Sequence, residues 1–291
     1  MSIDFIENVK RSVSTSLPTA SSIVGEVIKT IYDTSTNASD LASVIERDPP
    51  LTAKILKVAN SAYFGATTEI NSLTRAIVVL GFDTIKELVT TMTVVQGLFS
   101  PGLDYGINRV GLWQHSVGTA KAAQLISTQT NIERPEIAYT VGLLHDIGKI
   151  LLALSFPDHY REVIKLAQLK QCRIILAEQK LLNTDHCMIG KIICDMWGLP
   201  ENIGSAILFH HDLKQSPKSS LKIAQLIHLG DVFCRKAQIG DPGDEVIPDP
   251  SNAALSLLGN KPDKIKENYA KIYEDFILVK DDIDVFFSGL S

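Results

Sequence analysis

The sequence predicts an all-α protein, because helical periodicity runs through almost the whole chain. In the segment SSIVGEVIKTIYD, for example, apolar residues recur at spacings of three and four from Ile23 to Ile31, which is typical of an amphipathic helix. The sequence contains no strand-like alternation, no repeat of fixed period and no low-complexity tract. We therefore expect helices packed on helices, with no sheet.

Composition excludes several classes of protein. The 291 residues are 45% hydrophobic and 21% charged, as in ordinary soluble domains, and the net charge of −5 lacks the basic character of nucleic-acid binders. The amino terminus, MSIDFIENVKRSV, has no signal-peptide core, and no apolar run approaches the roughly 20 residues of a membrane span. The four cysteines form no C-x-x-C pair, so we interpret them as reduced thiols that fill the core. We expect a cytoplasmic protein that binds neither nucleic acid nor membrane.

The first hundred residues predict a series of short helices. After the helix near residues 23–31, NASDLASVIERDP predicts a second helix with Ser39 as its N-cap. Pro49 and Pro50 then end that helix and begin the next, since proline suits a first turn and breaks an interior. The string from 73 to 99 predicts two helices joined near Gly81.

Two stretches rich in turn-forming residues divide the chain. SPGLDYG, at 100–106, and IGDPGDEVIPDPSN, at 239–252, combine proline, glycine and aspartate. They predict an amino-terminal helical region (1–100), a central helical bundle (101–240) and a carboxyl-terminal helical extension (241–291). Helices are expected at 108–128, 135–153, 157–169, 174–184, 185–197, 200–212, 219–237, 251–258 and 262–276.

The histidines carry the main functional signal. All seven lie between residues 115 and 228. The stretch VGLLHDIGKI places His145 beside Asp146 within an apolar, helix-like run, with Lys149 one turn later. Buried polar side chains need partners, because leaving them unpaired is costly. Those partners are either hydrogen bonds or a metal ion, for which imidazole and carboxylate are common ligands.

Each candidate ligand also has a structural interpretation. His115 alone is consistent with a buried histidine bonded to a backbone group, and His186 with the start of a helix. The pair His210-His211 would suit a helix end, where positive side chains meet the dipole. Asp231 is harder to explain in this way, because it lies in an apolar helix. Taken together in this order, the residues favour a metal site, whereas His159 and His228 are interpreted as structural or surface residues.

The order His … His-Asp … Asp, carried by His115, His145, Asp146 and Asp231, resembles the HD superfamily of metal-dependent phosphohydrolases. The additional His186 and His210-His211 resemble the two-metal HD-GYP branch, whose members hydrolyse cyclic dinucleotides.

The amino-terminal region narrows this resemblance. LPTASSIVGEVI, DPPLTAKILKVANSAYFG and INSLTRAIVVLGFDTIKELV are similar to the HDOD domain, a signalling relative of the HD phosphohydrolases, and the pattern from Leu51 to Gly65 is the most specific part. EQKLLNTDHCMIGKIICDMWGLPENIGSAILFHHD fits as well, so the resemblance covers roughly residues 13–237. It implies an all-α HDOD fold with an amino-terminal helical layer packed on an HD-like bundle. Many HDOD domains have lost their metal ligands and serve as interaction modules, whereas this chain keeps the set.

The resemblance also implies roles for the site residues. Asp146 would bridge two ions; the ligands of one ion would be His115, His145 and Asp231, and those of the other His186, His210 and His211. Two ions held about 3.5–4 Å apart would clamp a phosphoryl group. Asp146 and Lys149 would be the catalytic residues, because a helix presents both on one side. Lys149 would meet a phosphate oxygen, or else be a solvated residue at a helix end. The donors suit divalent transition metals: iron or manganese first, zinc or nickel as alternatives.

Two departures from the HD-GYP pattern leave several functions open. Gly111 stands four residues before His115, where that branch carries an extra glutamate, and no Gly-Tyr-Pro follows His210-His211. Both argue against hydrolysis of cyclic dinucleotides. Three functions remain open. The chain is a signalling protein with phosphohydrolase activity, or a non-catalytic module whose metal is structural or vestigial and whose face around residues 50–98 binds a signalling protein. The third alternative is a sensor that binds a phosphorylated, nucleotide-like ligand without cleaving it.

Overall fold

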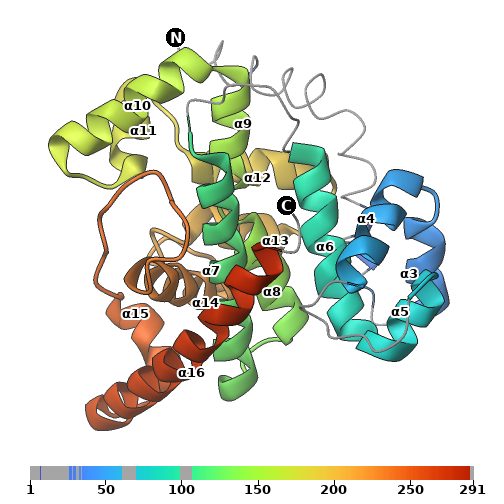
Figure 1. The fold of residues 1–291 in the computed structure, drawn as a ribbon. Helices are drawn as coiled ribbons and strands as arrows, with labels where there is room; N and C mark the ends of the chain where they lie inside the picture. The colour runs from blue at the N-terminus through green and yellow to red at the C-terminus, as the bar shows by residue number, and fades with distance from the viewer. Residues whose placement is uncertain are drawn as a thin grey trace.

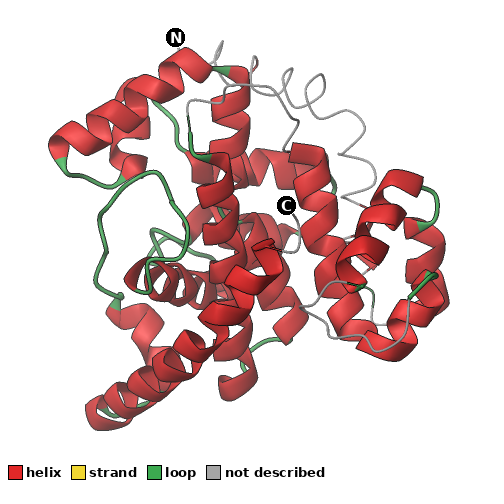
Figure 2. Cartoon of the chain, viewed as in Figure 1, coloured by secondary structure: helices red, strands yellow, loops and turns green. Residues whose placement is uncertain are grey.

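The computed structural model describes residues 35–60, 70–98 and 107–288, together with a few single positions before residue 35. Within these ranges every regular element is a helix (Figure 2), which confirms the predicted all-α class. The predicted break at 100–106, part of the helix near 23–31 and the last part of the pattern ending at Gly65 lie outside the described residues.

The amino-terminal region contains four short helices around their own apolar core. They are α3 (Ala38–Ile45), α4 (Pro49–Ala59), α5 (Leu73–Leu80) and α6 (Phe82–Leu98). Pro49 is the first residue of α4, and Gly81 separates α5 from α6 with φ of 88°, as the sequence predicted. Helix α6 brings these four helices into contact with the central part of the chain (Figure 1). The hydroxyl of Thr91 on α6 lies 2.8 Å from the hydroxyl of Tyr139 on α8.

The N-cap of α3 differs from the prediction. Asn37, not Ser39, caps the helix, because its side-chain oxygen accepts hydrogen bonds from the backbone N–H groups of Ser39 and Asp40. The Asp40 carboxylate in turn accepts from the Asn37 N–H, which completes a capping box. Ser39 is a good capping residue by type, but only Asn37 has an acidic residue three positions later that returns the bond.

The central bundle has eight helices in the described residues. They are α7 (Arg109–Thr130), α8 (Pro135–Leu144), α9 (Ile147–Ser155), α10 (Pro157–Lys170), α11 (Ile174–Leu182), α12 (His186–Met196), α13 (Glu201–Phe209) and α14 (Lys218–Lys236). Helix α7 runs through the centre and packs against α8 and α14 (Figure 1). The stretch Pro135–Ser155 has the length and hydropathy of a membrane span, but 94% of its apolar window is buried inside the fold, so it is a core segment.

The helix predicted at 135–153 is two helices. His145 ends α8 and Asp146 precedes α9, with φ of −102° and ψ of 11° at Asp146. The apolar pattern continues across this junction because both helices are buried, and periodicity alone does not reveal a two-residue break. The break matters for the site, since it lies at the His-Asp pair itself.

Gly148 permits the close approach of α9 and α12. A Cβ atom at this position would lie 2.0 Å from the carbonyl oxygen of His186, well inside van der Waals contact. Any larger residue would push the start of α12 away from α9. The absence of a side chain at 148 therefore lets His186 reach the neighbourhood of Asp146.

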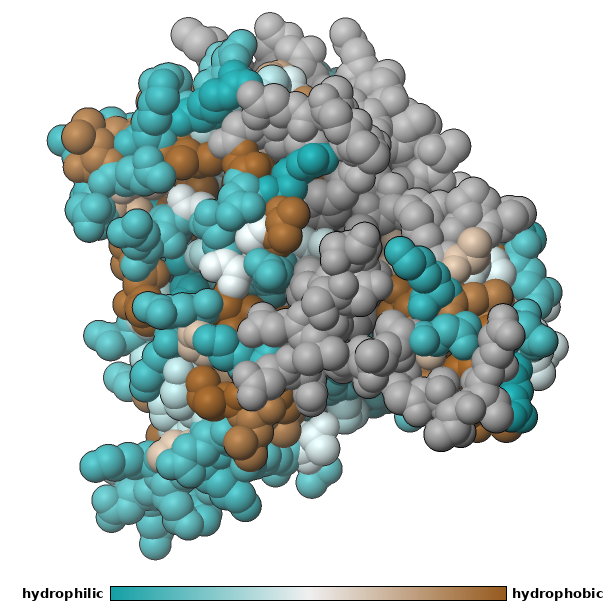
Figure 3. Space-filling model, viewed as in Figure 1, coloured by the Kyte–Doolittle hydropathy of each residue, from teal (hydrophilic) through white to brown (hydrophobic). Residues whose placement is uncertain are grey.

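The chain ends in a long helix that belongs to the same core. After the loop at 237–251 come α15 (Asn252–Leu255), η1 (Ser256–Leu258) and α16 (Pro262–Ser288), which extends beyond the predicted end at 276. Ile272, Phe276 and Ile283 are buried in the apolar cluster that α7 and α14 share. Of these, Ile283 lies beyond residue 276, and its burial accounts for the extra length of the helix. The outer end of α16 carries hydrophilic side chains (Figure 3).

We expect Gly148→Ala to lower the free energy of unfolding by about 1–3 kcal/mol, as overpacking against a fixed backbone does. The matched control is Gly204→Ala on α13, where the added methyl meets mainly the flexible Lys191 side chain. For Gly204→Ala we expect little loss of stability, because alanine favours a helix more than glycine does. Urea denaturation of both variants measures the difference; equal stabilities would contradict the role given to Gly148.

Candidate metal centre

The predicted site residues gather at one place in the central bundle, although they span more than a hundred positions. They are His115 on α7, His145 and Asp146 between α8 and α9, His186 at the start of α12, His210 and His211 after α13, and Asp231 on α14. All except His211 are at most 1% exposed, and His211 is half-buried. Below, "the cluster" means these seven residues.

The five imidazole rings form a continuous group. Ring centroids lie 5.3 Å apart for His115 and His145, 5.2 Å for His145 and His210, and 5.7 Å for His186 and His210. His211 lies 3.9 Å from His210 and 5.3 Å from His186, measured in the same way.

Asp146 lies between two sets of histidines. Its Oδ2 is 3.2 Å from Nε2 of His145 and 3.7 Å from Nε2 of His115. Its Oδ1 is 3.4 Å from Nε2 of His186. One carboxylate oxygen thus faces each set, which is the arrangement that a bridging carboxylate requires.

The ligand atoms fall into two groups, each within 4.8 Å. One group contains His115, His145 and Asp146, and the other His186, His210, His211 and also Cys187. Asp231 joins the first group, with Oδ1 3.0 Å from Nε2 of His115.

Cys187 is not one of the predicted metal ligands, although it lies beside them. Its Sγ lies 3.7 Å from Nδ1 of His210, the ring nitrogen that faces the carbonyl oxygen of Ile207. Burial raises the pKa of the Cys187 thiol well above its ordinary value, so the sulfur stays protonated. This is consistent with a thiol that packs in the core.

Several buried polar atoms in the cluster lack a hydrogen bond to any described residue. Nε2 of His145, His186 and His210 and Oδ1 of Asp146 make no hydrogen bond to any residue the structure describes. A buried polar atom left unsatisfied costs about 1–3 kcal/mol. Several such atoms around one small space, all of them nitrogen or carboxylate oxygen, fit a divalent transition metal.

Three histidines of the cluster, His115, His210 and His211, are in the protonation state that metal binding needs. Burial lowers the pKa of His210 and His211 well below the ordinary value, and the neighbouring imidazoles lower both further. Burial also lowers the pKa of His115, more than Asp231 raises it. At neutral pH these rings are therefore neutral and offer a lone pair.

The carboxylates remain ionised despite their burial. Burial alone would raise the pKa of Asp146, but the neighbouring His145 and Lys149 outweigh it and hold that pKa well below its ordinary value. Burial also raises the pKa of Asp231 and is its largest single influence, but Arg235 and His115 together outweigh it and hold that pKa well below its ordinary value.

The likeness to known proteins agrees with this architecture. Residues 17–213 match the model of the HDOD domain. The chain belongs to the HDOD family. An HDOD domain protein of unknown function from Geobacter sulfurreducens is 26% identical, with a TM-score of 0.75 over 95% of this chain and 96% of that one. A candidate phosphohydrolase from Shewanella amazonensis shares the fold, with 21% identity and a TM-score of 0.71 over 97% of this chain and 98% of that one.

An uncharacterized protein of Treponema pallidum is 26% identical over 224 residues, which are 75% of this chain and 42% of that protein. This HDOD chain thus spans less than half of that curated relative.

Backbone carbonyls orient two of the histidines. Nδ1 of His145 donates to the carbonyl oxygen of Gly142, and Nδ1 of His210 to that of Ile207, both at 2.7 Å. A carbonyl only accepts, so Nδ1 carries the proton and Nε2 presents its lone pair to the cluster.

Glu178, which was not among the predicted site residues, orients His186. Its Oε2 accepts from Nδ1 of His186 at 2.6 Å and from the His186 backbone N–H at 3.0 Å, while Oε1 accepts from the Tyr160 hydroxyl at 2.7 Å. The signal was present in the sequence: Glu178 is a charged residue in the apolar stripe formed by Ile174, Ala177 and Leu182 on α11.

Lys149 and Arg235 hold the two carboxylates. Nζ of Lys149 donates to Oδ2 of Asp146 at 2.7 Å and to the carbonyl oxygen of Pro242 at 3.0 Å. Lys149 is fully buried, so the solvated alternative from the sequence is wrong; α9 is enclosed along most of its length. Nε of Arg235 donates to Oδ1 of Asp231 at 2.8 Å. Arg235 was also missed, although it stands one helical turn after Asp231.

The remaining histidines lie outside the cluster. His228 bonds the carbonyl oxygen of His210 through Nδ1 and accepts from the Ser251 N–H through Nε2, which is a structural role. His159 is exposed on α10. Both positions agree with their interpretation from the sequence.

We expect Glu178→Gln to weaken metal binding by about 10–100-fold, because the amide no longer accepts strongly from Nδ1 of His186. Competition with a chromophoric chelator measures the affinity. Tyr160→Phe is the control, since it removes only the hydroxyl that bonds the other oxygen of Glu178. If the two variants bound metal equally well, Glu178 would have no orienting role.

We expect the metal-free protein to lose stability as the pH falls below about 6.5, where histidines of the unfolded chain take up protons that the folded state excludes. Each strongly depressed histidine removes about 1.4 kcal/mol per pH unit until its folded pKa is reached. Urea unfolding with a chelator present, from about pH 7.5 down to about pH 5, measures this slope.

The control for this slope is His159→Gln, which leaves it unchanged because His159 is exposed. His210→Gln reduces the slope. A His210→Gln protein that kept the full slope would show that His210 does not exclude a proton on folding.

Proposed function

We propose that this HDOD protein binds one or two divalent transition metal ions in the cluster and acts as a metal-dependent phosphohydrolase in bacterial signal transduction. The observation that carries the proposal is the convergence, around Asp146, of buried nitrogen and oxygen atoms that make no hydrogen bond to any described residue. A module that bound no metal would bear the energetic cost of burying these nitrogen and oxygen atoms without any ligand to satisfy them. Free cysteines at all four positions suit a cytoplasmic setting.

The ligand assignment follows the two groups of atoms. One ion would be held by His115, His145 and Asp231 and the other by His186, His210 and His211, with Asp146 as the ligand available to both. Iron and manganese suit this mixture of imidazole and carboxylate, with zinc or nickel as alternatives. When bound, such ions supply Lewis acidity toward a phosphoryl oxygen.

The surrounding residues keep the donors ready for this task. Lys149 and Arg235 fix the positions of Asp146 and Asp231 by direct hydrogen bonds. Nζ of Lys149 donates to two acceptors in the described structure, Asp146 and the carbonyl oxygen of Pro242, so its direct role is to position Asp146. A contact between its third N–H and a phosphate oxygen stays a prediction.

Arg173 offers a further positive charge for an anionic substrate. It precedes α11, and its Nη2 is buried without a hydrogen bond to any described residue. Its charge is among the causes that lower the pKa of His211, the cluster member that is partly exposed. A guanidinium nitrogen that has no hydrogen bond to a described residue, near the partly exposed His211, suits a phosphorylated, nucleotide-like substrate.

A second candidate function is a docking module for a signalling protein. Val78 and Val79, on α5 of the amino-terminal layer, are 72% and 39% exposed. They lie within the face around residues 50–98, where an interaction module would bind its partner.

We expect the purified wild-type protein to contain about two equivalents of iron or manganese. His145→Gln and Asp146→Asn should lose this metal, and with it turnover of bis(4-nitrophenyl) phosphate. His159→Gln, an exposed histidine, is the control and keeps both. Elemental analysis precedes the assay, so that metal binding and catalysis are judged separately.

Arg173→Gln extends the same experiment, because it should retain the metal and raise KM for the phosphodiester. Stably folded protein that takes up neither iron nor manganese would overturn the proposal. Protein that binds metal but hydrolyses no phosphoester would favour the docking module.

A further inference from the structure

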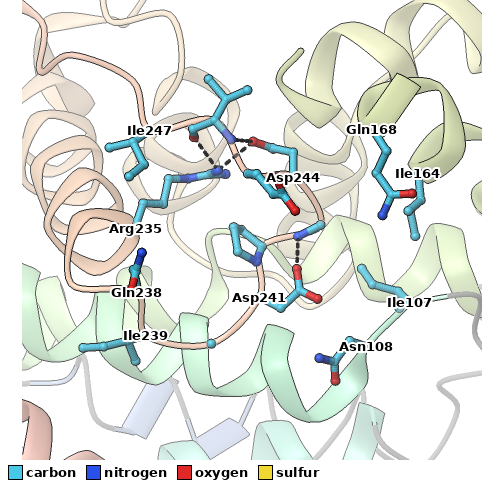
Figure 4. Close-up of a pocket in the computed structure, with 15 residues that line it drawn as sticks. Ile107, Asn108, Ile164, Gln168, Arg235, Gln238, Ile239, Asp241, Asp244 and Ile247 are labelled. Carbon is cyan, nitrogen blue, oxygen red and sulfur yellow. Dashed lines mark hydrogen bonds and ion pairs between the residues drawn. The ribbon is translucent and has the colours of Figure 1, made fainter. Parts of the chain in front are cut away.

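A cavity of about 750 Å³ lies next to the cluster but is not lined by any of its seven residues. Its walls come from the loop at 238–247, from Ile107 and Asn108 at the start of α7, and from Ile164 and Gln168 on α10. Figure 4 shows Ile164 and Gln168 on one side and Arg235 and Ile247 on the other, with Asp241 and Asp244 between them. Its volume is in the range of small-molecule sites.

The loop at 238–247 reaches one carboxylate of the cluster through Lys149. The carbonyl oxygen of Pro242, a residue of the cavity wall, accepts from Nζ of Lys149 at 3.0 Å. The same Nζ donates to Oδ2 of Asp146 at 2.7 Å. A single ammonium group therefore joins the cavity wall to the central carboxylate.

The same loop reaches the other carboxylate through Arg235. Oδ1 of Asp244 accepts from Nη1 of Arg235 at 2.9 Å, and Nε of that guanidinium donates to Oδ1 of Asp231 at 2.8 Å. The second oxygen of Asp244 accepts from the backbone N–H of Ile174. Both carboxylates of the cluster are thus positioned by cations that residues of the cavity wall hold.

The charges of the cavity favour a cation. Arg235 is paired with Asp231 and Asp244. The carboxylates of Asp241 and Glu245 then remain without a cationic partner among the described residues. Asp241 accepts only from the Gly243 N–H, and Glu245 has no ion pair, among the residues the structure describes.

The rest of the wall favours an aliphatic chain. Ile107, Ile164 and Ile247 provide apolar surface beside these carboxylates, and the carboxamides of Asn108 and Gln168 add hydrogen-bonding groups. An ammonium group on a short methylene chain matches both features, because the methylenes pack on isoleucine while the charge meets a carboxylate.

We propose that this cavity binds a small aliphatic amine and that its occupancy tightens metal binding in the cluster through the loop at 238–247. An occupant that holds the loop in place restrains Lys149 and Arg235, and through them the positions of Asp146 and Asp231. The coupling rests on the proposed function, because it requires the cluster to bind metal. Amine binding to the cavity does not depend on that function.

The first arm measures amine binding to the full-length, metal-free protein by calorimetry. The probes are 1,4-diaminobutane, 1,4-butanediol and succinate, which have chains of the same length and differ in charge. We expect the diamine to bind and the diol and the dicarboxylate to give no measurable heat. Binding of all three, or of none, would overturn the assignment of an amine.

The second arm uses variants of the cavity wall. Asp241→Asn combined with Glu245→Gln should weaken diamine binding by at least about ten-fold, since both changes keep the shape of the side chain and remove its charge. Glu162→Gln, an exposed residue paired with Lys165 on α10, is the matched control and leaves the affinity unchanged. Unchanged affinity in the double variant would place the amine elsewhere.

The third arm measures coupling with Mn²⁺, whose free concentration is followed by electron paramagnetic resonance. We expect saturating diamine to raise the Mn²⁺ affinity by about five-fold or more, and Mn²⁺ to raise the diamine affinity by the same factor, as linkage requires. Unchanged or weaker Mn²⁺ binding would overturn the coupling. Protein that binds diamine but no Mn²⁺ would instead show that the proposed metal function fails while the amine site stands.

Discussion

Asp146 holds an ionised carboxylate in the interior of a helical bundle, and much of the central architecture follows from that burial. A charge removed from water is stabilised only by close partners, and its protein partners are Lys149 and the imidazoles of the cluster. The other buried carboxylate of the cluster, Asp231, is held in the same way by Arg235 and His115. Removing any one of these partners leaves the buried charge with less compensation.

The need to direct several donors toward Asp146 explains local features that break ordinary helix rules. The junction between α8 and α9 falls at the His-Asp pair, so both side chains leave the helix at its end and reach the same space. Gly148 has no side chain because the carbonyl of His186 occupies that position. Glu178, a carboxylate inside an apolar helix face, is tolerated because His186 and Tyr160 satisfy it.

The two parts of the described chain contribute differently. The amino-terminal helices have their own apolar core and reach the bundle through α6, whereas all the donors come from α7 to α14. The loop at 238–247 contributes to the site with the bundle, because it contacts Lys149 and Arg235, the cations that hold the carboxylates of the cluster. In this HDOD protein, the cations that hold the two carboxylates of the cluster also contact a cavity wall.

The sequence by itself determined the helical class, the joint at Gly81 and the seven residues of the cluster. Periodicity and turn chemistry are local, and the buried polar types stand out against apolar surroundings. It did not distinguish Asn37 from Ser39 as a cap, and it did not reveal the break at 145–146, because the apolar pattern continues through it. Glu178 and Arg235 were missed, since their roles depend on partners that the tertiary structure brings together: His186 lies eight residues from Glu178, and Asp244 lies nine from Arg235. Only packing decided which donors meet, because the separations between helices depend on side-chain volumes at their contacts, such as the missing side chain of Gly148, and not on spacing along the chain.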